Sequence, residues 1–205
     1  RGTHMSRFVE ILNRYRNGIS TKNVRDILEE MKKELNAETA HFEIEFPYFI
    51  TKSAPVSGEK AKMEYTCRLV ANSDVDYYMI EVKVPVLSLC PCSKEISEFG
   101  AHNQRSIFTM QIEAREKIWI EDIIEIAESS ASSDLYSILK REDEKYITEK
   151  SYQNPVFVED MVRIAAEKLV NTKGILWFSV ESENMESIHN HSAYAQIFMN
   201  LRENV

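Results

Sequence analysis

Long stretches of this chain alternate apolar and polar residues, and this period of two is the feature that most constrains the fold. In the clearest run, one side of an extended segment carries Tyr78, Ile80, Val82, Val84 and Val86. Such alternation is typical of a strand with one buried face. Further runs of this kind lie at residues 41–50, 63–69, 108–114, 175–180 and 193–201. Together they predict an antiparallel sheet whose buried face is covered by helices.

Helical spacing appears between the strand runs. The apolar residues of one predicted helix fall at i, i+3, i+4, i+7 and i+11, and they are Val24, Ile27, Leu28, Met31 and Leu35. A second apolar stripe covers residues 119–127, and a third helix is predicted to begin at Asn154-Pro155, an N-cap residue followed by proline. Shorter helices are expected at 8–17, ending at Asn17-Gly18, and at 134–140. Pro47 indicates a bulge or a sheet edge.

The order of these elements predicts two similar α+β modules. Residues 1–88 form the first and residues 89–205 the second, and together they make one bimodular domain. Each module has an antiparallel sheet with a pair of helices on one face. The first module begins directly at a helix and so lacks an opening hairpin, which implies further residues ahead of Arg1.

Charge and cysteine usage narrow the functional class. A formal net charge of −8, with no basic run, argues against a general nucleic-acid binder. No apolar stretch approaches the roughly 20 residues of a membrane span, and no signal pattern opens the chain, so we expect a cytoplasmic protein. Three cysteines are too few for a disulfide scaffold. Cys67 alternates with apolar residues and is predicted to be a buried small hydrophobe.

The segment after the clearest strand run is the strongest candidate for a site. It carries Cys90 and Cys92, with His102 twelve positions after the first cysteine, in a stretch predicted to be irregular. Thiolate and imidazole suit zinc and other borderline metals. A thiol pair without metal, or a histidine with a capping role, would explain the same residues.

Three further places concentrate reactive side chains. Glu144 lies in a charge run, where most residues are solvated surface. Glu159 has a plain helical explanation, because Arg163 stands four residues on and can form an ion pair with it. His189 and His191 point the same way in an extended backbone, and paired imidazoles facing one cleft are natural proton shuttles.

Five sequence motifs in a fixed order restrict the protein family more closely than residue spacing alone. They are Leu-Cys-Pro-Cys-Ser-Lys-Glu-Ile-Ser at 89–97, Gly-Ala-His-Asn-Gln-Arg at 100–105, Lys-Arg-Glu-Asp-Glu-Lys-Tyr at 140–146, Asn-Pro-Val-Phe-Val-Glu-Asp at 154–160 and Glu-Ser-Ile-His-Asn-His at 186–191. In this set the chain resembles the type IB GTP cyclohydrolases, a bacterial family related to an archaeal branch. Residues 2–8 also resemble the family's N-terminal motif, and the likeness covers essentially the whole chain. Glu142 stands where the family pattern leads us to expect proline.

The resemblance implies a tunnelling fold (T-fold), built from tandem modules of two strands, two helices and two strands. It implies a homo-oligomer, normally a homotetramer, with active sites at subunit interfaces. By motif, it assigns a metal to Cys90, His102 and Glu144, with Cys92 as a nearby second thiol. Glu159 matches the carboxylate that anchors guanine, and its two oxygens suit a bidentate, charge-assisted contact with the ring N–H and the amine.

The implied reaction is opening of the GTP imidazole ring at C8, release of formate and reclosure to 7,8-dihydroneopterin triphosphate. It serves folate and pterin synthesis or a modified tRNA base. Zinc is the expected metal, with manganese or iron(II) as alternatives. His189 and His191 are candidates for the proton transfers. The candidate triphosphate ligands are Lys94, Arg105 and Arg7, with His4 as a weaker one.

Other functions fit the same residues. An archaeal-type cyclohydrolase would give a cyclic-phosphate product. A non-catalytic protein of the same fold would use the motif residues only to hold structural zinc, in a closed site with four ligands. The related nitrile-reducing branch ranks last, because the chain shows neither its motif nor a dinucleotide-binding glycine pattern.

Overall fold

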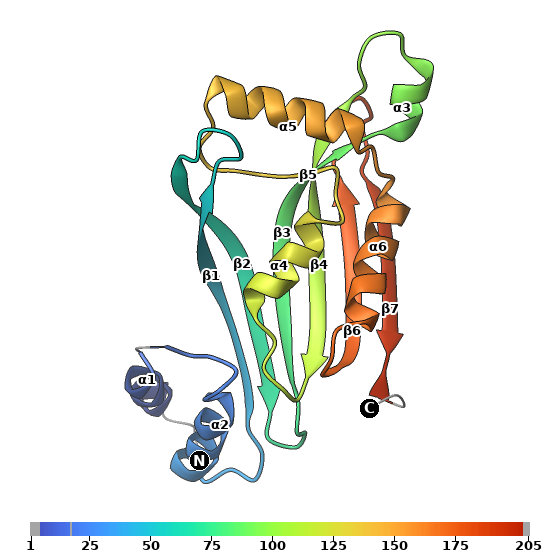
Figure 1. The fold of residues 1–205 in the computed structure, drawn as a ribbon. Helices are drawn as coiled ribbons and strands as arrows, with labels where there is room; N and C mark the ends of the chain where they lie inside the picture. Colours follow the sequence, from blue (N-terminus) through green and yellow to red (C-terminus); the bar gives the residue numbers. More distant parts are fainter. Residues whose placement is uncertain (1–4, 17, 203–205) are drawn as a thin grey trace.

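The computed structural model describes residues 5–16 and 18–202, which fold around one antiparallel sheet (Figure 1). In chain order the elements are α1 Met5–Arg14, α2 Val24–Leu35, β1 His41–Ser53, β2 Lys60–Asn72, β3 Tyr78–Leu89, α3 Pro91–Ile96, β4 Asn103–Ala114, α4 Ile120–Glu128, β5 Ser133–Asp134, α5 Arg141–Gln153, α6 Val158–Val170, β6 Ile175–Asn184 and β7 Ala193–Asn200. No helix of the described part is long and apolar enough to cross a membrane.

The strands of the sheet lie in the order β1-β2-β3-β4-β6-β7, and the short β5 pairs with β3. Every pairing is antiparallel, which confirms the prediction from alternation. The register of β3 and β4 runs from Tyr78 opposite Ala114 to Leu89 opposite Asn103. Pro47 lies in β1, at one edge of the described sheet, as proline in a strand requires. The sheet is continuous across residues 88 and 89, and the division into two modules there stays a prediction.

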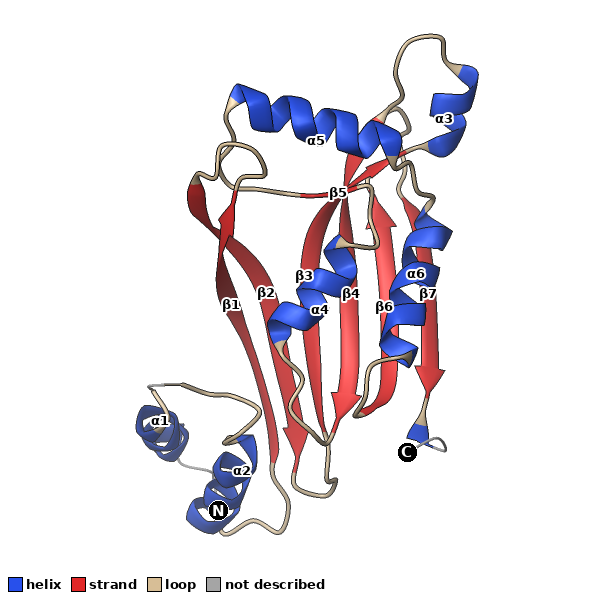
Figure 2. Cartoon of the chain, viewed as in Figure 1, coloured by secondary structure: helices blue, strands red, loops and turns tan. Residues whose placement is uncertain are grey.

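Helices α4 and α6 cover one face of the sheet, and the main core lies beneath them (Figure 2). Alternate residues of β4 point into this core, and Phe108, Met110 and Ile112 are fully buried. Each such side chain contributes about 1.5–3 kcal/mol through removal of apolar surface from water. Cys67 in β2 is also fully buried, and burial raises the pKa of its thiol to about 12. The prediction that this cysteine acts as a small hydrophobe is therefore confirmed.

The helix predicted at 134–140 is wrong. Ser133 and Asp134 instead pair with β3, and residues 135–140 are irregular up to the start of α5. The reason is tertiary, because the Lys52 ammonium donates to the Asp134 carboxylate and to the Leu135 carbonyl. The charge run that follows, in which no element was expected, opens the regular helix α5. Most of its side chains are exposed, so it lacks a clear apolar stripe.

Two predicted helix ends also differ. Asn154 caps the C-terminus of α5 rather than opening the next helix, and its side chain donates to the Ala131 carbonyl at 3.0 Å. Helix α6 begins only at Val158. At the start of the chain, α1 ends at Arg14, and the stop predicted at Asn17 lies outside the described residues.

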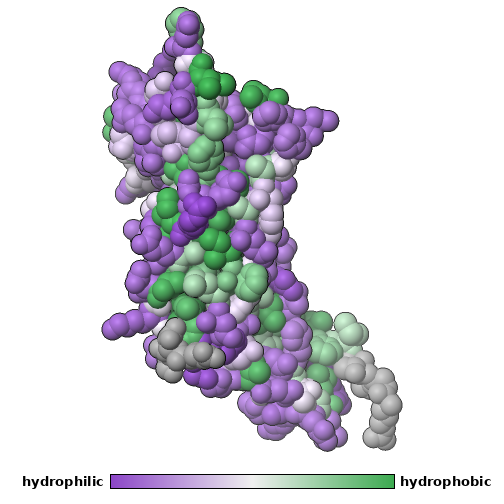
Figure 3. All heavy atoms as spheres, turned by 90° about the vertical axis from the view of Figure 1, so that its right-hand side faces the viewer, coloured by the Kyte–Doolittle hydropathy of each residue, from purple (hydrophilic) through white to green (hydrophobic). Residues whose placement is uncertain are grey.

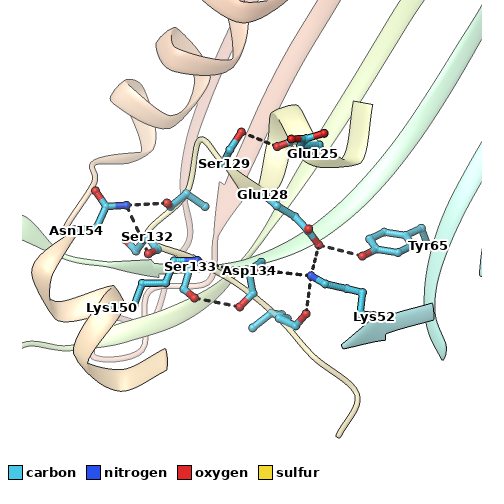
Figure 4. Close-up of polar contacts among 12 residues, drawn as sticks. Lys52, Tyr65, Glu125, Glu128, Ser129, Ser132, Ser133, Asp134, Lys150 and Asn154 are labelled. Carbon is cyan, nitrogen blue, oxygen red and sulfur yellow. Dashed lines mark hydrogen bonds and ion pairs between the residues drawn. The ribbon is translucent and has the colours of Figure 1, made fainter. Parts of the chain in front are cut away.

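A partly buried charge network joins β1, α4, β5 and α5 (Figure 4). The Lys52 Nζ donates to Glu128 Oε1 at 2.8 Å and to Asp134 Oδ2 at 3.1 Å. Tyr65 Oη donates to the same Glu128 oxygen at 2.9 Å, and Lys150 Nζ donates to Asp134 Oδ1 at 2.8 Å. The network fixes α5 and β5 against the sheet, at the end of the molecule that carries the segment from Cys90 to His102.

The network predicts a specific response to acid. Burial works to raise the pKa of Asp134, but hydrogen bonds from Lys150 and Tyr136 and the charge of Lys52 lower it from 3.8 to about 2. Because the folded pKa is depressed, the carboxylate stabilises the fold above pH 3.8, and this contribution is lost as pH falls toward 2. Urea unfolding of the Asp134→Asn variant is expected to show lower stability than the native chain at neutral pH, with the gap closing in acid. A gap of constant size from neutral pH to pH 2 would contradict this assignment.

Candidate active site

The candidate site lies at the end of the sheet where β3 gives way to the segment before β4, beside one end of α5 (Figure 1). Leu89, the last residue of β3, is fixed from two sides. Its N–H donates to Ser132 Oγ at 3.0 Å, and its carbonyl accepts from the Val156 N–H at 3.2 Å. Three segments that are distant in sequence therefore meet at Leu89, directly before Cys90. The Val156 contact brings the start of α6 to this point.

Cys90 and His102 are brought together by the backbone. The Cys90 N–H donates to the His102 carbonyl at 3.1 Å, which extends the β3–β4 pairing by one step. The segment between them is not wholly irregular as predicted, because it contains the short helix α3. Cys90 caps that helix, and its Sγ accepts from the Ser93 N–H at 3.4 Å. Cys92, on the first turn, is exposed.

The His102 ring is the centre of a polar cluster. Its side chain is only 9% exposed, and its Nδ1 lies 2.9 Å from Gln104 Oε1 and 3.8 Å from Glu186 Oε2. The His189 ring lies 6.4 Å from that of His102, and His191 lies 5.0 Å from His189, measured between ring centroids. The structure thus groups the two motif histidines with His102, at the turn that follows β6.

Gln104 and Glu186 are members of this cluster that the sequence interpretation did not single out. Gln104 is buried on β4, and its Nε2 lies 2.9 Å from Ser88 Oγ and 3.4 Å from Glu186 Oε1. Ser88 in turn shares a 2.8 Å hydrogen bond with Ser106. Position i+2 from His102 in an extended backbone was the available signal for Gln104, since alternate side chains share a face.

Glu144 does not lie with Cys90 and His102 in this chain. It is exposed in the first turn of α5, whereas the contact of α5 with α3 is made by Tyr152. Tyr152 lies eight positions after Glu144, which is about 12 Å along a helix. Within residues 5–16 and 18–202, no three His, Cys, Asp or Glu side chains form a group that could hold a metal ion. The donor chemistry of Cys90 and His102 nevertheless suits a borderline metal.

The residue beside Glu144 is held firmly. Asp143 is fully buried, and its Oδ1 accepts from the backbone N–H groups of Val56 and Ser57 at 2.8 and 2.9 Å. Its Oδ2 accepts from the Ser57 hydroxyl at 2.6 Å and from the Lys140 N–H at 2.8 Å. These hydrogen bonds hold the pKa of Asp143 well below its usual range, against the effect of burial. The first turn of α5 is therefore tied to the turn between β1 and β2.

The predicted phosphate ligands are spread over the molecule. Lys94 lies near the site, where its Nζ donates to the Tyr152 carbonyl at 2.6 Å and sits over the Tyr152 ring. Arg105 is exposed on β4. Arg7 lies on α1, at the opposite end of the molecule (Figure 1), and donates to the Glu34 carbonyl at 2.7 Å. His4 lies outside the described residues.

Glu159 is exposed in the first turn of α6, and the ion pair expected for it is not formed. Arg163 pairs with Asp160 instead. The start of α6 lies next to the end of β3, through the contact of Val156 with Leu89. Glu159 is thus three residues from a point that is hydrogen-bonded to the neighbour of Cys90.

Solved structures of similar shape define the class of fold. A uricase from Arthrobacter globiformis matches with a TM-score of 0.52 and 8% sequence identity, over 95% of this chain and 75% of that one. A urate oxidase from Bacillus sp. TB-90 matches with a TM-score of 0.50 and 12% identity, over 96% and 75%. At these identities the likeness shows the fold alone. The chain is a T-fold protein, which confirms the predicted fold class.

Sequence comparison gives the family. Residues 1–195 match the family described as type I GTP cyclohydrolase folE2. A GTP cyclohydrolase FolE2 of Geotalea uraniireducens is 60% identical over 204 residues, which cover 99% of this chain and 75% of that protein. One of Pelobacter propionicus is 57% identical over 203 residues, 98% of this chain and 79% of that protein. The chain belongs to this family, the type IB GTP cyclohydrolases, as its five motifs predicted.

Proposed function

We propose that this chain, as a GTP cyclohydrolase, opens the imidazole ring of GTP at C8, releases formate and recloses the product to 7,8-dihydroneopterin triphosphate for folate synthesis. The observation that carries the proposal is the grouping of the His102, His189 and His191 rings, with Cys90 hydrogen-bonded to the His102 backbone, in a chain that matches this family along nearly its whole length. His189 and His191 would transfer protons between the opening ring and water, since imidazole gains and loses protons near neutral pH.

The family is metal-dependent, and we propose Cys90, His102 and Glu144 as the ligands and zinc as the metal, with manganese and iron(II) as alternatives. When bound, such an ion supplies a Lewis acid and an activated water at neutral pH. Cys90 and His102 are already adjacent through their backbone hydrogen bond. Glu144 must move toward them when the metal binds or when the subunits assemble. We propose that Cys92, an exposed thiol two positions after Cys90, modulates the metal site. We propose a cytoplasmic location, because cellular thiols are kept reduced there and a cysteine would remain available as a metal ligand.

The test is formate release and pterin fluorescence from GTP, on protein that has been stripped with a chelator and resupplied with zinc, manganese or iron(II). Turnover that depends on metal and yields the triphosphate product supports the proposal. A cyclic-phosphate product would move the chain to the archaeal type of reaction. Tight metal binding without any consumption of GTP would favour a structural metal site and reject the proposed activity.

We propose that Glu159 anchors the guanine base through its two carboxylate oxygens. The Glu159→Gln variant replaces one acceptor with a donor that faces the donors of guanine, and we expect kcat/KM for GTP to fall roughly 10²-fold, mainly through KM. Asp160→Asn is the matched control, because this neighbouring carboxylate pairs with Arg163. Equal losses in the two variants would reject a specific role for Glu159.

We assign the triphosphate to Lys94, Arg105 and Arg7. Lys94 is part of the segment from Cys90 to His102, and its ammonium donates to the Tyr152 carbonyl of α5. Arg7 lies at the other end of the molecule and would act only in the site of a neighbouring subunit. An active site at a subunit interface can therefore include Arg7, whereas a site formed within one chain cannot.

We propose that the chain forms a homotetramer through its sheet edges. β7 is an edge strand of the described sheet, and Tyr194, Phe198 and Met199 on it are exposed. Figure 3, which looks onto this side of the molecule, shows apolar side chains along the middle of the face, interrupted by hydrophilic ones. An unpaired strand edge with apolar side chains is a ready surface for pairing with another chain.

The Phe198→Glu variant is expected to dissociate the assembly, because it places a charge on the apolar strand edge. Light scattering of the native chain should give the mass of a tetramer, and the variant should give a smaller species. Val170→Glu is the control, since Val170 is an exposed apolar residue on the helical side of the sheet. A native chain that is monomeric at micromolar concentration would reject the tetramer.

A further inference from the structure

We propose that Gln104 is a positioning residue that holds the His102 ring in the tautomer with its proton on Nδ1, and so leaves Nε2 free to bind the metal. This inference rests on the metal site proposed above. Gln104 would not itself bind the metal. Its effect on His102 depends on which atoms of the cluster can donate a hydrogen bond and which can only accept one.

The orientation of the Gln104 amide is set by Glu186. One end of the amide lies 3.4 Å from Glu186 Oε1 and 2.9 Å from Ser88 Oγ. An ionised carboxylate only accepts hydrogen bonds, so the end that faces it must be the NH₂ group. The Ser88 hydroxyl accepts the second amide hydrogen and is also hydrogen-bonded to Ser106. The other end of the amide, toward His102, is therefore the oxygen.

The amide oxygen then fixes the imidazole. Gln104 Oε1 lies 2.9 Å from His102 Nδ1, and this oxygen can only accept, so the proton of the neutral ring resides on Nδ1. Glu186 Oε2, at 3.8 Å from the same nitrogen, favours a proton there as well. Nε2 is left with its lone pair. Metal-binding histidines in proteins are commonly held this way, by a hydrogen bond from the second ring nitrogen.

The anchor itself is rigid. Gln104 is 6% exposed, and Ser88 and Ser106 are fully buried. The three residues lie on the neighbouring strands β3 and β4, while Glu186 follows the adjacent β6. Flipping the amide would bring its oxygen against the Glu186 carboxylate and would leave a buried polar group unpaired. The His102 tautomer is thus fixed by the sheet before any metal arrives.

The experiment measures the tautomer first, in the metal-free native protein labelled with ¹⁵N-histidine. NMR spectra distinguish the two neutral forms, and the His102 signals are assigned by their loss in His102→Asn. We expect the form protonated on Nδ1. A ring protonated on Nε2, or one that exchanges between the two forms, would overturn the proposal without reference to any variant or to catalysis.

The second readout is metal affinity, measured by competition with a chromophoric chelator. Gln104→Leu is expected to lose the single tautomer and to weaken zinc binding about 10- to 100-fold, the usual effect of losing such a partner. Gln111→Leu is the matched control, because Gln111 lies on the same strand and bonds to Glu81, away from the site. An unchanged affinity in a folded Gln104→Leu protein would overturn the proposal. If the native chain binds no metal, the proposed metal site fails, while the tautomer result still decides the role of Gln104.

Discussion

Replacing Cys90 with alanine is expected to abolish GTP turnover, with a loss of roughly 10³-fold or more in kcat/KM. The reason is the loss of the proposed thiolate ligand, since a metal held by fewer ligands no longer activates water near neutral pH. The fold should survive, because Cys90 lies in a half-exposed segment after β3 and its backbone contact with His102 does not involve the side chain. Formate release, metal content and thermal unfolding of the same sample check the prediction.

Two matched variants sharpen the result. Cys67→Ala removes a thiol that is buried in β2, away from the site, and should cost stability but not metal. Cys92→Ala removes the exposed thiol two positions on. Retention of activity in Cys92→Ala together with its loss in Cys90→Ala would assign the ligand to Cys90. Full activity in Cys90→Ala would reject the proposed metal site.

The largest effect on stability is expected from Lys52→Met, which should lower the free energy of unfolding by about 3 kcal/mol. The Lys52 ammonium is 13% exposed and lies between the carboxylates of Glu128 and Asp134. Without it, Glu128 keeps only the Tyr65 hydroxyl as a polar partner in this network, and two partly buried negative charges face each other. Urea unfolding at fixed protomer concentration measures the change, because association would otherwise contribute to apparent stability.

Lys145→Met is the control for this prediction. Lys145 is 74% exposed and pairs with Glu149 at 3.8 Å along α5, so the same substitution should change stability by no more than about 0.5 kcal/mol. The double variant Lys52→Met with Glu128→Gln should recover part of the loss, since it removes the carboxylate that is left without a cation, whereas Asp134 keeps Lys150. Equal stability of the two single variants would show that the network contributes little.

The period-two alternation was enough to predict the strands and the antiparallel sheet, because one buried face forces that pattern on the sequence. It also placed Cys67 correctly in the core. The spacing of Cys90, His102, His189 and His191 indicated a site, and the fold brings these residues to one end of the sheet. The assignment of Glu144 and Glu159 came from motif resemblance, and those roles stay proposals.

What sequence reasoning missed has a common physical cause. The extended segment at Asp134 is held by Lys52, whose position is set more than eighty residues earlier in the chain. Asn154 reads locally as a helix N-cap, but its side chain is bonded to the Ala131 carbonyl. Gln104 gains its importance only from Ser88 and Glu186. In each case the decisive partner is distant in sequence, where local pattern carries no information.

The tie between Asp143 and the turn at Val56 and Ser57 has a consequence for how this chain can be altered. Surface turns between strands normally accept extra residues with little cost. Here the turn supplies two backbone N–H groups and a hydroxyl to a buried carboxylate, next to the proposed ligand Glu144. A peptide tag or domain inserted between Val56 and Ser57 would therefore disturb the first turn of α5.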